Sequence, residues 1–271
     1  MPKIEDWAAA DAVMQQYNAA RYYDYLLGGF HNFAVDRKAG DFVIQICPDV
    51  RLGALANRGF LRRAVKFLSQ QGIDQFLDLG SGIPTSGNVH EIAETYNPAA
   101  RVVYVDNDPI AVIHSQSILK DNPNVSVIQA DINDLEGILK HPTFTGLIDL
   151  KRPAAVLMLS ILHFVKNNEK LAAIMSGLRN ALVPGSYLAI SHFTDEGAPA
   201  ETIQQLNRLT AGAGSPSVSR SRAEITRLFD GFELVEPGVV YIPLWRQDSP
   251  EDVLVSAPEH SMNFAGVGRK A

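Results

Sequence analysis

The stretch FLDLGSGIPTSGN, residues 76–88, is an apolar run that ends in a glycine-rich turn. Buried parallel strands are near-continuous apolar runs, and in open α/β sheets ligands bind beyond the carboxyl ends of the strands. Gly80 and Gly82 permit a sharp turn and let the backbone approach a ligand without an intervening Cβ atom. The stretch therefore predicts a strand, a ligand-binding turn and the start of a helix.

Further apolar runs with the same character follow along the chain. From about residue 73 they alternate with segments of helical periodicity, which is typical of a doubly wound sheet. The predicted strands are residues 75–79, 101–106, 125–129, 154–160, 186–191, 232–236 and 263–268. No full crossover helix fits between the last two, so we expect an antiparallel edge strand. We predict a Rossmann-like, doubly wound, seven-stranded α/β sheet that is mostly parallel.

Helix signals lie between these runs and before them. Ser221 and Glu224 form a capping box, while Pro184 and Gly185 end a helix before the fifth strand. The run TAGAGSPSVSR, residues 210–220, predicts a flexible connector or a lid. The predicted helices are residues 88–96, 109–120 and 167–182, together with most of the first 71 residues. We predict an N-terminal helical cap or substrate lid at residues 1–71 and a cofactor-binding domain at residues 72–271.

Composition and charge restrict the class of protein. The chain has 271 residues, is 46% hydrophobic and 20% charged, and its single cysteine, Cys47, excludes an internal disulfide and a multi-cysteine zinc site. We expect Cys47 to be a buried packing residue. A net charge of −6 argues against a nucleic-acid partner. We interpret the basic run NRGFLRR, residues 57–63, as the solvated face of a helix.

Neither a secretory signal nor a membrane span is evident in the chain as given. The N-terminal residues lack a basic region followed by an apolar one, and the longest apolar run, residues 153–165, is too short to cross a bilayer. We therefore expect a cytoplasmic protein without a membrane partner.

The glycine turn leaves more than one nucleotide cofactor open. A P-loop run is absent, and a dinucleotide fingerprint requires a third glycine where this chain has Thr85. Asp106 ends the second predicted strand, where a carboxylate can accept hydrogen bonds from ribose hydroxyls of NAD or of S-adenosylmethionine. Asp131 begins the loop after the third strand. Three acids at consecutive strand ends create a pocket that favours a cationic ligand.

The run LDLGSGIP resembles the D/E-x-G-x-G-x-G turn of class I S-adenosylmethionine-dependent methyltransferases, with Pro84 at the last position. The resemblance implies that Asp131 binds the adenine amino group. In the N-terminal cap, we expect Arg21 to pair with the methionine carboxylate because a guanidinium suits that geometry. The expected cofactor-binding residues are Arg21, Tyr25, Gly28, Asp78, Gly80, Ser81, Gly82, Asp106, Asn107, Asp131, Ile132 and Ser160.

The resemblance narrows to one family of S-adenosyl methyltransferases. Its N-terminal signature is similar to ARYYDYLLGGFHNFAVDR, residues 20–37, and other family patterns are similar to NRGFLRRAVKFL, VVYVDNDP, VLMLSILHFV, VPGSYLAISH and the terminal FAGVGRK. The match extends from about residue 19 to residue 270. It implies S-adenosyl-L-methionine as cofactor and methyl transfer as the reaction.

Methyl transfer needs alignment and removal of the proton from the attacking group, and needs no metal in principle. His163 follows the fourth strand in a segment that resembles one of small-molecule O-methyltransferases, whose histidine is the base. Here Phe164 and Val165 replace the Asp-Trp pair of that segment. His192, at the end of the fifth strand, is the second candidate base. HEIAE, residues 90–94, is not a zinc-protease motif, and no hydrolase elbow is present.

We therefore predict a methyltransferase that acts on an O or N nucleophile of a small molecule. The alternatives are an NAD(P)-dependent oxidoreductase and a non-catalytic regulator that binds S-adenosylmethionine. Methylation of nucleic acid is disfavoured by the acidic charge. Assembly into a homo-oligomer stays open.

Overall fold

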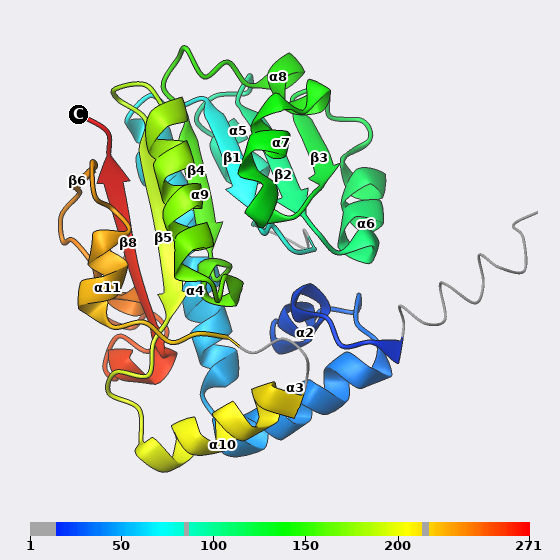
Figure 1. Cartoon of the computed structure of the whole chain (residues 1–271), viewed down its shortest axis with the longest axis vertical. Coiled ribbons are helices and arrows are strands. Elements are labelled where there is room, and N and C mark those ends of the chain that lie inside the picture. Colours follow the sequence, from blue (N-terminus) through cyan, green and yellow to red (C-terminus); the bar gives the residue numbers. More distant parts are fainter. Residues whose placement is uncertain (1–14, 84–86, 213–216) are drawn as a thin grey trace, which may run out of the picture.

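The computed structural model describes residues 15–83, 87–212 and 217–271, and it shows one mixed sheet with helices on both faces (Figure 1). Each predicted strand is present. The sheet has eight strands where seven were predicted, because Val240–Tyr241 forms an additional two-residue strand. The strands are β1 Gln75–Leu79, β2 Arg101–Asp106, β3 Val125–Gln129, β4 Ala155–Leu159, β5 Tyr187–Phe193, β6 Glu233–Leu234, β7 Val240–Tyr241 and β8 Asn263–Arg269.

The strand order places the glycine turn beside a reversal of the sheet. The order is β3-β2-β1-β4-β5-β8-β6, with β7 also paired to β8. Strands β1 to β5 are parallel, whereas β8 runs antiparallel to β5 with Tyr187 opposite Arg269. The predicted antiparallel edge is thus confirmed. Chain order reverses between β1 and β4, where doubly wound sheets bind ligands at the carboxyl edge.

The helices largely follow the sequence prediction. Ser221 caps its helix with Glu224 as the capping-box partner, and the helix before β5 ends at Ala181 ahead of Gly185, which has a φ of +84°. The helices are α2 Ala19–Leu26, α3 Ala34–Ile46, α4 Val50–Gln70, α5 Val89–Glu94, α6 Pro109–Leu119, α7 Leu135–Lys140, α8 Pro142–Leu147, α9 Asn168–Ala181, α10 Ala200–Gly212 and α11 Arg222–Arg227. The predicted loop at 210–220 overlaps the end of α10, and its residues 213–216 lie outside the described residues.

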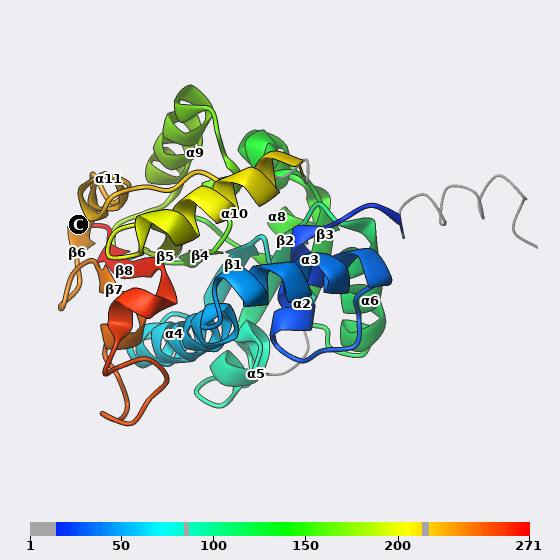
Figure 2. The same cartoon turned by 90° about the horizontal axis from the view of Figure 1, so that it is seen from below.

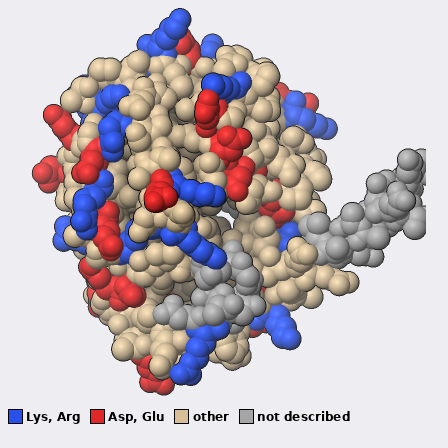
Figure 3. Space-filling view, in the orientation of Figure 1, with Lys and Arg blue, Asp and Glu red and all other residues tan. Residues whose placement is uncertain are grey.

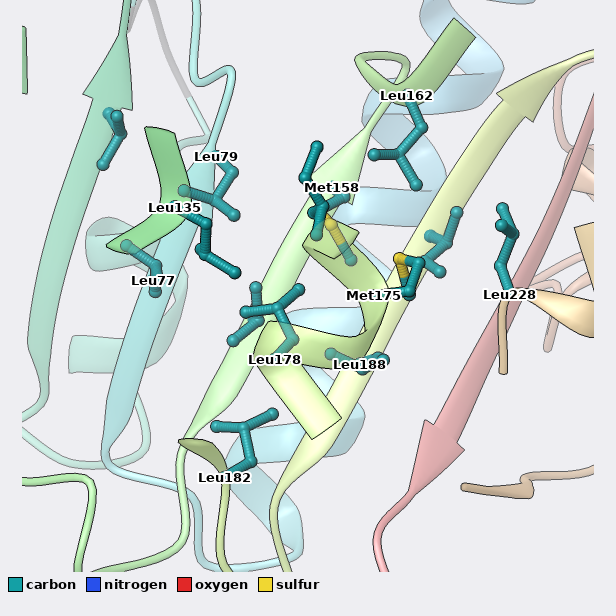
Figure 4. Packing of buried hydrophobic residues seen from close by; sticks show 14 of the residues in the cluster. Leu77, Leu79, Leu135, Met158, Leu162, Met175, Leu178, Leu182, Leu188 and Leu228 are labelled. Atoms are coloured by element: carbon teal, nitrogen blue, oxygen red, sulfur yellow. The ribbon is translucent and has the colours of Figure 1, made fainter. Parts of the chain in front are cut away.

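The core has a layer on each face of the sheet because successive strand residues point to opposite faces. On one face Leu77 and Leu79 of β1 contact the layer that includes Met175 and Leu178 of α9 (Figure 4). On the other face Phe76 packs in a second cluster with the apolar side of α4. Covering both faces explains why these strands are continuous apolar runs.

Helices α2, α3 and α10 lie across the carboxyl ends of the strands (Figures 1 and 2). Helix α4 belongs to residues 1–71 but packs against the sheet through side chains such as Phe60 and Leu68. The division of the chain into a cap at 1–71 and a domain at 72–271 stays a prediction. Within the described residues, none of the helices combines the length and apolar character needed to cross a bilayer.

Candidate active site

A cavity of about 580 Å³ lies between the carboxyl ends of β1 to β5 and the helices that cross them. The molecular surface is hollowed near this place, between the sheet and the covering helices (Figure 3). The lining of the cavity combines two kinds of surface. Polar and acidic groups come from the ends of β1, β2 and β3, and mainly apolar groups come from α2, α3 and α10.

The glycine turn after β1 shapes one wall of this cavity. The N–H groups of Gly80 and Ser81 both donate to the carbonyl of Val105, at 2.8 Å and 3.1 Å. Gly80 has a φ of +77°, and a Cβ atom there would lie 2.6 Å from Ile161. A Cβ atom on Gly82 would meet nothing within 4 Å, so the backbone at Gly82 borders open space. Pro84 and Thr85, on which the cofactor alternatives turned, lie outside the described residues.

Asp106 is held in place by the two loops around it. Its Oδ2 accepts a hydrogen bond from the N–H of Gly82 at 2.7 Å, and its Oδ1 accepts one from the N–H of Asp108 at 2.9 Å. Burial raises the pKa of Asp106, while these backbone hydrogen bonds lower it. The carboxylate is thus fixed at the cavity wall with lone pairs left for a ligand.

Asp78 is a buried carboxyl group that lines the cavity and accepts no hydrogen bond among the described residues. Burial raises the pKa of Asp78 to about 7, although Arg58 lowers it and Asp106 raises it further. A carboxyl group in such a place is satisfied by a ligand that supplies a positive charge or N–H donors. Because S-adenosylmethionine carries a sulfonium and an ammonium group, this wall fits that ligand.

The other predicted cofactor residues at the strand ends also line the cavity. Asp131 caps a short 3-10 helix at Ile132–Asp134, and its Oδ1 accepts hydrogen bonds from the backbone and the side chain of Asn133. Ser160 has a φ of +54°, and its N–H donates to the Oγ of Ser191 at 2.9 Å. The structure brings together Asp78, Gly80, Ser81, Gly82, Asp106, Asn107, Asp131, Ile132 and Ser160.

Arg21 does not line the cavity, and its guanidinium is used inside the protein. The side chain is buried and pairs with Asp36 at 3.0 Å and with Asp108 at 3.4 Å. It also donates to the carbonyl of Gln16. These contacts tie α2 to α3 and to the loop after β2, so Arg21 positions these segments, and its predicted role as a ligand of the methionine carboxylate stays a prediction.

Tyr25 and Gly28 also lie away from the lining of the cavity. Tyr25 donates from its hydroxyl to Asp41 of α3, and Arg51 lies over its ring, 5.1 Å from the centroid. Gly28 is exposed in the turn after α2, with a φ of +80°. The N-terminal signature therefore holds α2 against α3, and other residues of α2 face the cavity.

Of the two candidate bases, His163 lines the cavity and His192 does not. The Nδ1 of His163 is buried without a hydrogen-bond partner among the described residues, and burial, reinforced by His192 and Arg220, lowers the pKa of His163 well below its usual value. The Nε2 of His192 accepts from Arg220 at 2.8 Å, and its Nδ1 donates to the carbonyl of Phe193 at 2.7 Å. Burial lowers the pKa of His192 to about 4.

Arg220 is a structural residue that sequence patterns do not reveal. Besides contacting His192, it donates to the carbonyl of Leu162 at 3.2 Å and to that of Val165 at 3.0 Å. These bonds hold the loop after β4 that carries His163. The partners lie 28 to 58 residues away in sequence, so no local pattern links them.

Two further lining residues, Asn57 and Arg58, come from α4. The amide of Asn57 donates to the hydroxyl of Tyr23 at 2.9 Å and accepts from Ser191 at 2.7 Å. Arg58 donates to the carbonyl of Gly87, the first described residue after the glycine turn, at 2.9 Å. The prediction of a solvated face for residues 57–63 is therefore wrong, since Arg63 is also buried, with hydrogen bonds to Ile242 and Trp245. A single helix pattern cannot show that α4 faces both the sheet and the cavity.

Comparison with known proteins identifies the family. The S-adenosyl methyltransferase family matches residues 5–271. The chain belongs to the S-adenosyl methyltransferase family. Its cofactor is S-adenosyl-L-methionine, and the chain is a methyltransferase. The family therefore decides against the two alternative functions, an NAD(P)-dependent oxidoreductase and a non-catalytic regulator.

Two solved structures resemble this methyltransferase along most of their length. A protein from Thermobifida fusca YX, described as a candidate methyltransferase, is 44% identical with a TM-score of 0.88. The match covers 94% of this chain and 96% of that one. A DUF574 family protein from Streptomyces avermitilis MA-4680 is 38% identical with a TM-score of 0.90, covering 95% of this chain and 99% of that one.

More distant structures share the fold alone. A geranyl diphosphate methyltransferase in complex with SAM is 14% identical with a TM-score of 0.51. The match covers 78% of this methyltransferase and 85% of that chain. A comparison with curated proteins found no match.

Proposed function

We propose that this methyltransferase transfers a methyl group to an O or N nucleophile of a small molecule. The observation that carries the proposal is one cavity whose lining combines two features. Asp78, a buried carboxyl group that accepts no hydrogen bond from the described residues, and the anchored Asp106 lie at the strand ends, and the covering helices supply a mainly apolar wall. The carboxyl groups suit a cationic nucleoside, and the apolar wall suits an acceptor molecule.

The residues that would hold S-adenosylmethionine come from the ends of three adjacent strands. Asp106 would accept hydrogen bonds from the ribose hydroxyls, and Asp131 would accept one from the adenine amino group. Asp78 would face the ammonium group, and Arg58 is the guanidinium that lines the cavity near the glycine turn. When bound, the cofactor supplies a methyl group activated by a sulfonium.

His163 is the residue we propose to receive the proton of the acceptor. It lines the cavity, and its lowered pKa keeps the imidazole neutral near pH 7. We assign no proton transfer to His192, because Arg220 occupies the nitrogen that would accept the proton. A base with a lowered pKa is weak, which favours acceptors that release a proton readily, such as phenols.

The cofactor site is tested by titrating S-adenosylmethionine and S-adenosylhomocysteine into the protein by calorimetry. Asp106→Asn should weaken both by roughly tenfold to hundredfold, because hydrogen bonds to a charged group are worth about 1.5–3 kcal/mol. Asp121→Asn, which changes an exposed carboxyl group outside the lining, is the matched control and should bind as the wild type does. Equal affinities for both variants would refute the assignment of Asp106.

Turnover is tested separately, by following the release of S-adenosylhomocysteine across pools of small-molecule acceptors. Release that requires one acceptor and is lost in His163→Phe, with cofactor affinity retained, is the expected result. Release with protein or RNA acceptors, but with none of the small molecules, would contradict the proposed substrate class.

A further inference from the structure

The half of the cavity bounded by the covering helices differs sharply in charge from the strand ends. The charged lining residues among those described are Asp78, Asp106, Asp131, Arg58 and Lys166, from the ends or following loops of β1 to β4 and from α4. The described lining residues of α2, α3 and α10 carry no charge. The apolar lining residues on this side are Leu26 of α2, Val43 of α3, Cys47 directly after α3, Leu206 of α10 and Met262 before β8.

This compartment also presents aromatic rings from different layers of the molecule. Tyr17 and Tyr22 form a tilted pair with ring centroids 5.8 Å apart, and both line the cavity. Phe164 after β4 and Phe193 at the end of β5 line it from the sheet side. Aromatic side chains bind planar apolar molecules by stacking and edge contacts.

Tyr22, like Tyr17, adds a phenol hydroxyl to this apolar surface. The hydroxyl of Tyr22 makes no hydrogen bond with any described residue, although the side chain is half-buried. Burial raises the pKa of Tyr22 above its usual value, so the hydroxyl stays protonated and can donate. The hydrogen bond that this donor lacks in the protein can come from a ligand.

From these observations we infer that the acceptor of this methyltransferase is an uncharged aromatic molecule, seated between the tyrosine pair and the strand ends, with an oxygen or nitrogen atom that accepts a hydrogen bond from Tyr22. This inference rests on the proposed function. A charged acceptor placed against α2 and α3 would lose its hydration without gaining a counter-ion from these helices.

The test compares matched neutral and charged probes on protein saturated with S-adenosylhomocysteine. Naphthol is compared with naphthoate, and indole with indole carboxylate, by calorimetry near pH 7.5. We expect each neutral probe to bind at least tenfold more tightly than its carboxylate. Tyr22→Phe should weaken naphthol about fivefold through the loss of one hydrogen bond. Val43→Lys should weaken naphthol and strengthen naphthoate, because it places a cation in the apolar wall.

Controls separate the outcomes. Phe42→Lys changes the neighbouring, exposed side chain of the same helix and should leave all probe affinities unchanged. Failure of the wild type to bind S-adenosylhomocysteine would refute the proposed function itself. Binding of S-adenosylhomocysteine, with carboxylates equal to or tighter than the neutral probes, would overturn the substrate class alone. An unchanged naphthol affinity in Tyr22→Phe would overturn the role of Tyr22, even if Val43→Lys failed to fold.

Discussion

Asp78 should make the unliganded protein less stable as the pH rises. The carboxyl group is buried beside Asp106 without a hydrogen-bond donor among the described residues, and burial raises its pKa to about 7. An unfolded chain has a pKa of about 3.9 at such a group. Because folding favours the protonated form, the carboxyl costs nothing below about pH 3.9. The cost then grows until about pH 7 and stays constant above it.

The size of this effect follows from the two pKa values. Between about pH 5 and about pH 8.5, linkage gives a loss of about 3 kcal/mol in the free energy of unfolding from this one group. Asp78→Asn removes the titrating group and leaves a side chain of the same shape. The free energy of unfolding of the variant, relative to the wild type, should therefore rise by about 3 kcal/mol between these two pH values.

Urea unfolding followed by circular dichroism at both pH values measures the effect. Titrating groups remote from Asp78 are common to both proteins and cancel in the difference. Asp121→Asn is the matched control, and its difference from the wild type should not change with pH, since this side chain is exposed. A change of less than about 1 kcal/mol for Asp78→Asn would refute the reasoning that burial dominates at this carboxyl group.

Other changes test the structural residues. Arg220→Leu should lower the free energy of unfolding by about 3 kcal/mol, because the carbonyl of Val165 and a nitrogen of His192 lose their donor and the carbonyl of Leu162 keeps only the N–H of Val165. Urea curves like those of the wild type would contradict this. Arg21→Met should cost about 3–5 kcal/mol by removing the cation that pairs with Asp36, whereas unchanged stability with lost cofactor binding would support the predicted ligand role of Arg21. Gly80→Ala should cost about 1–3 kcal/mol through its positive φ and the clash with Ile161, measurable as a lower Tm, and an unchanged Tm would show that the turn relaxes.

Much of the cofactor wall was predictable from local pattern. An apolar run predicts a parallel strand, and parallel strands bring their carboxyl ends to one edge. Asp78, Asp106 and Asp131 therefore had to be neighbours once their strands were adjacent. The same logic identified His163, which follows β4. The two-residue strand β7 escaped prediction because so short a run has no period to detect.

The helices show where local pattern is insufficient. Tyr22 and Tyr25 are three residues apart on α2, yet Tyr22 faces the cavity while Tyr25 bonds to Asp41 on α3. Helical spacing places them on roughly one side, and only the position of α3 decides which surface each one meets.

The amino-acid sequence by itself determined the sheet, the glycine turn, the acidic strand ends and the family, because these depend on residues close together in the chain. Tertiary structure decided the rest. It engaged Arg21 with Asp108, 87 residues away, and His192 with Arg220, 28 residues away, and it separated the charged half of the cavity from the apolar one. The availability of a side chain to a ligand depends on which distant partners the fold brings to it, and local periodicity carries no information about them.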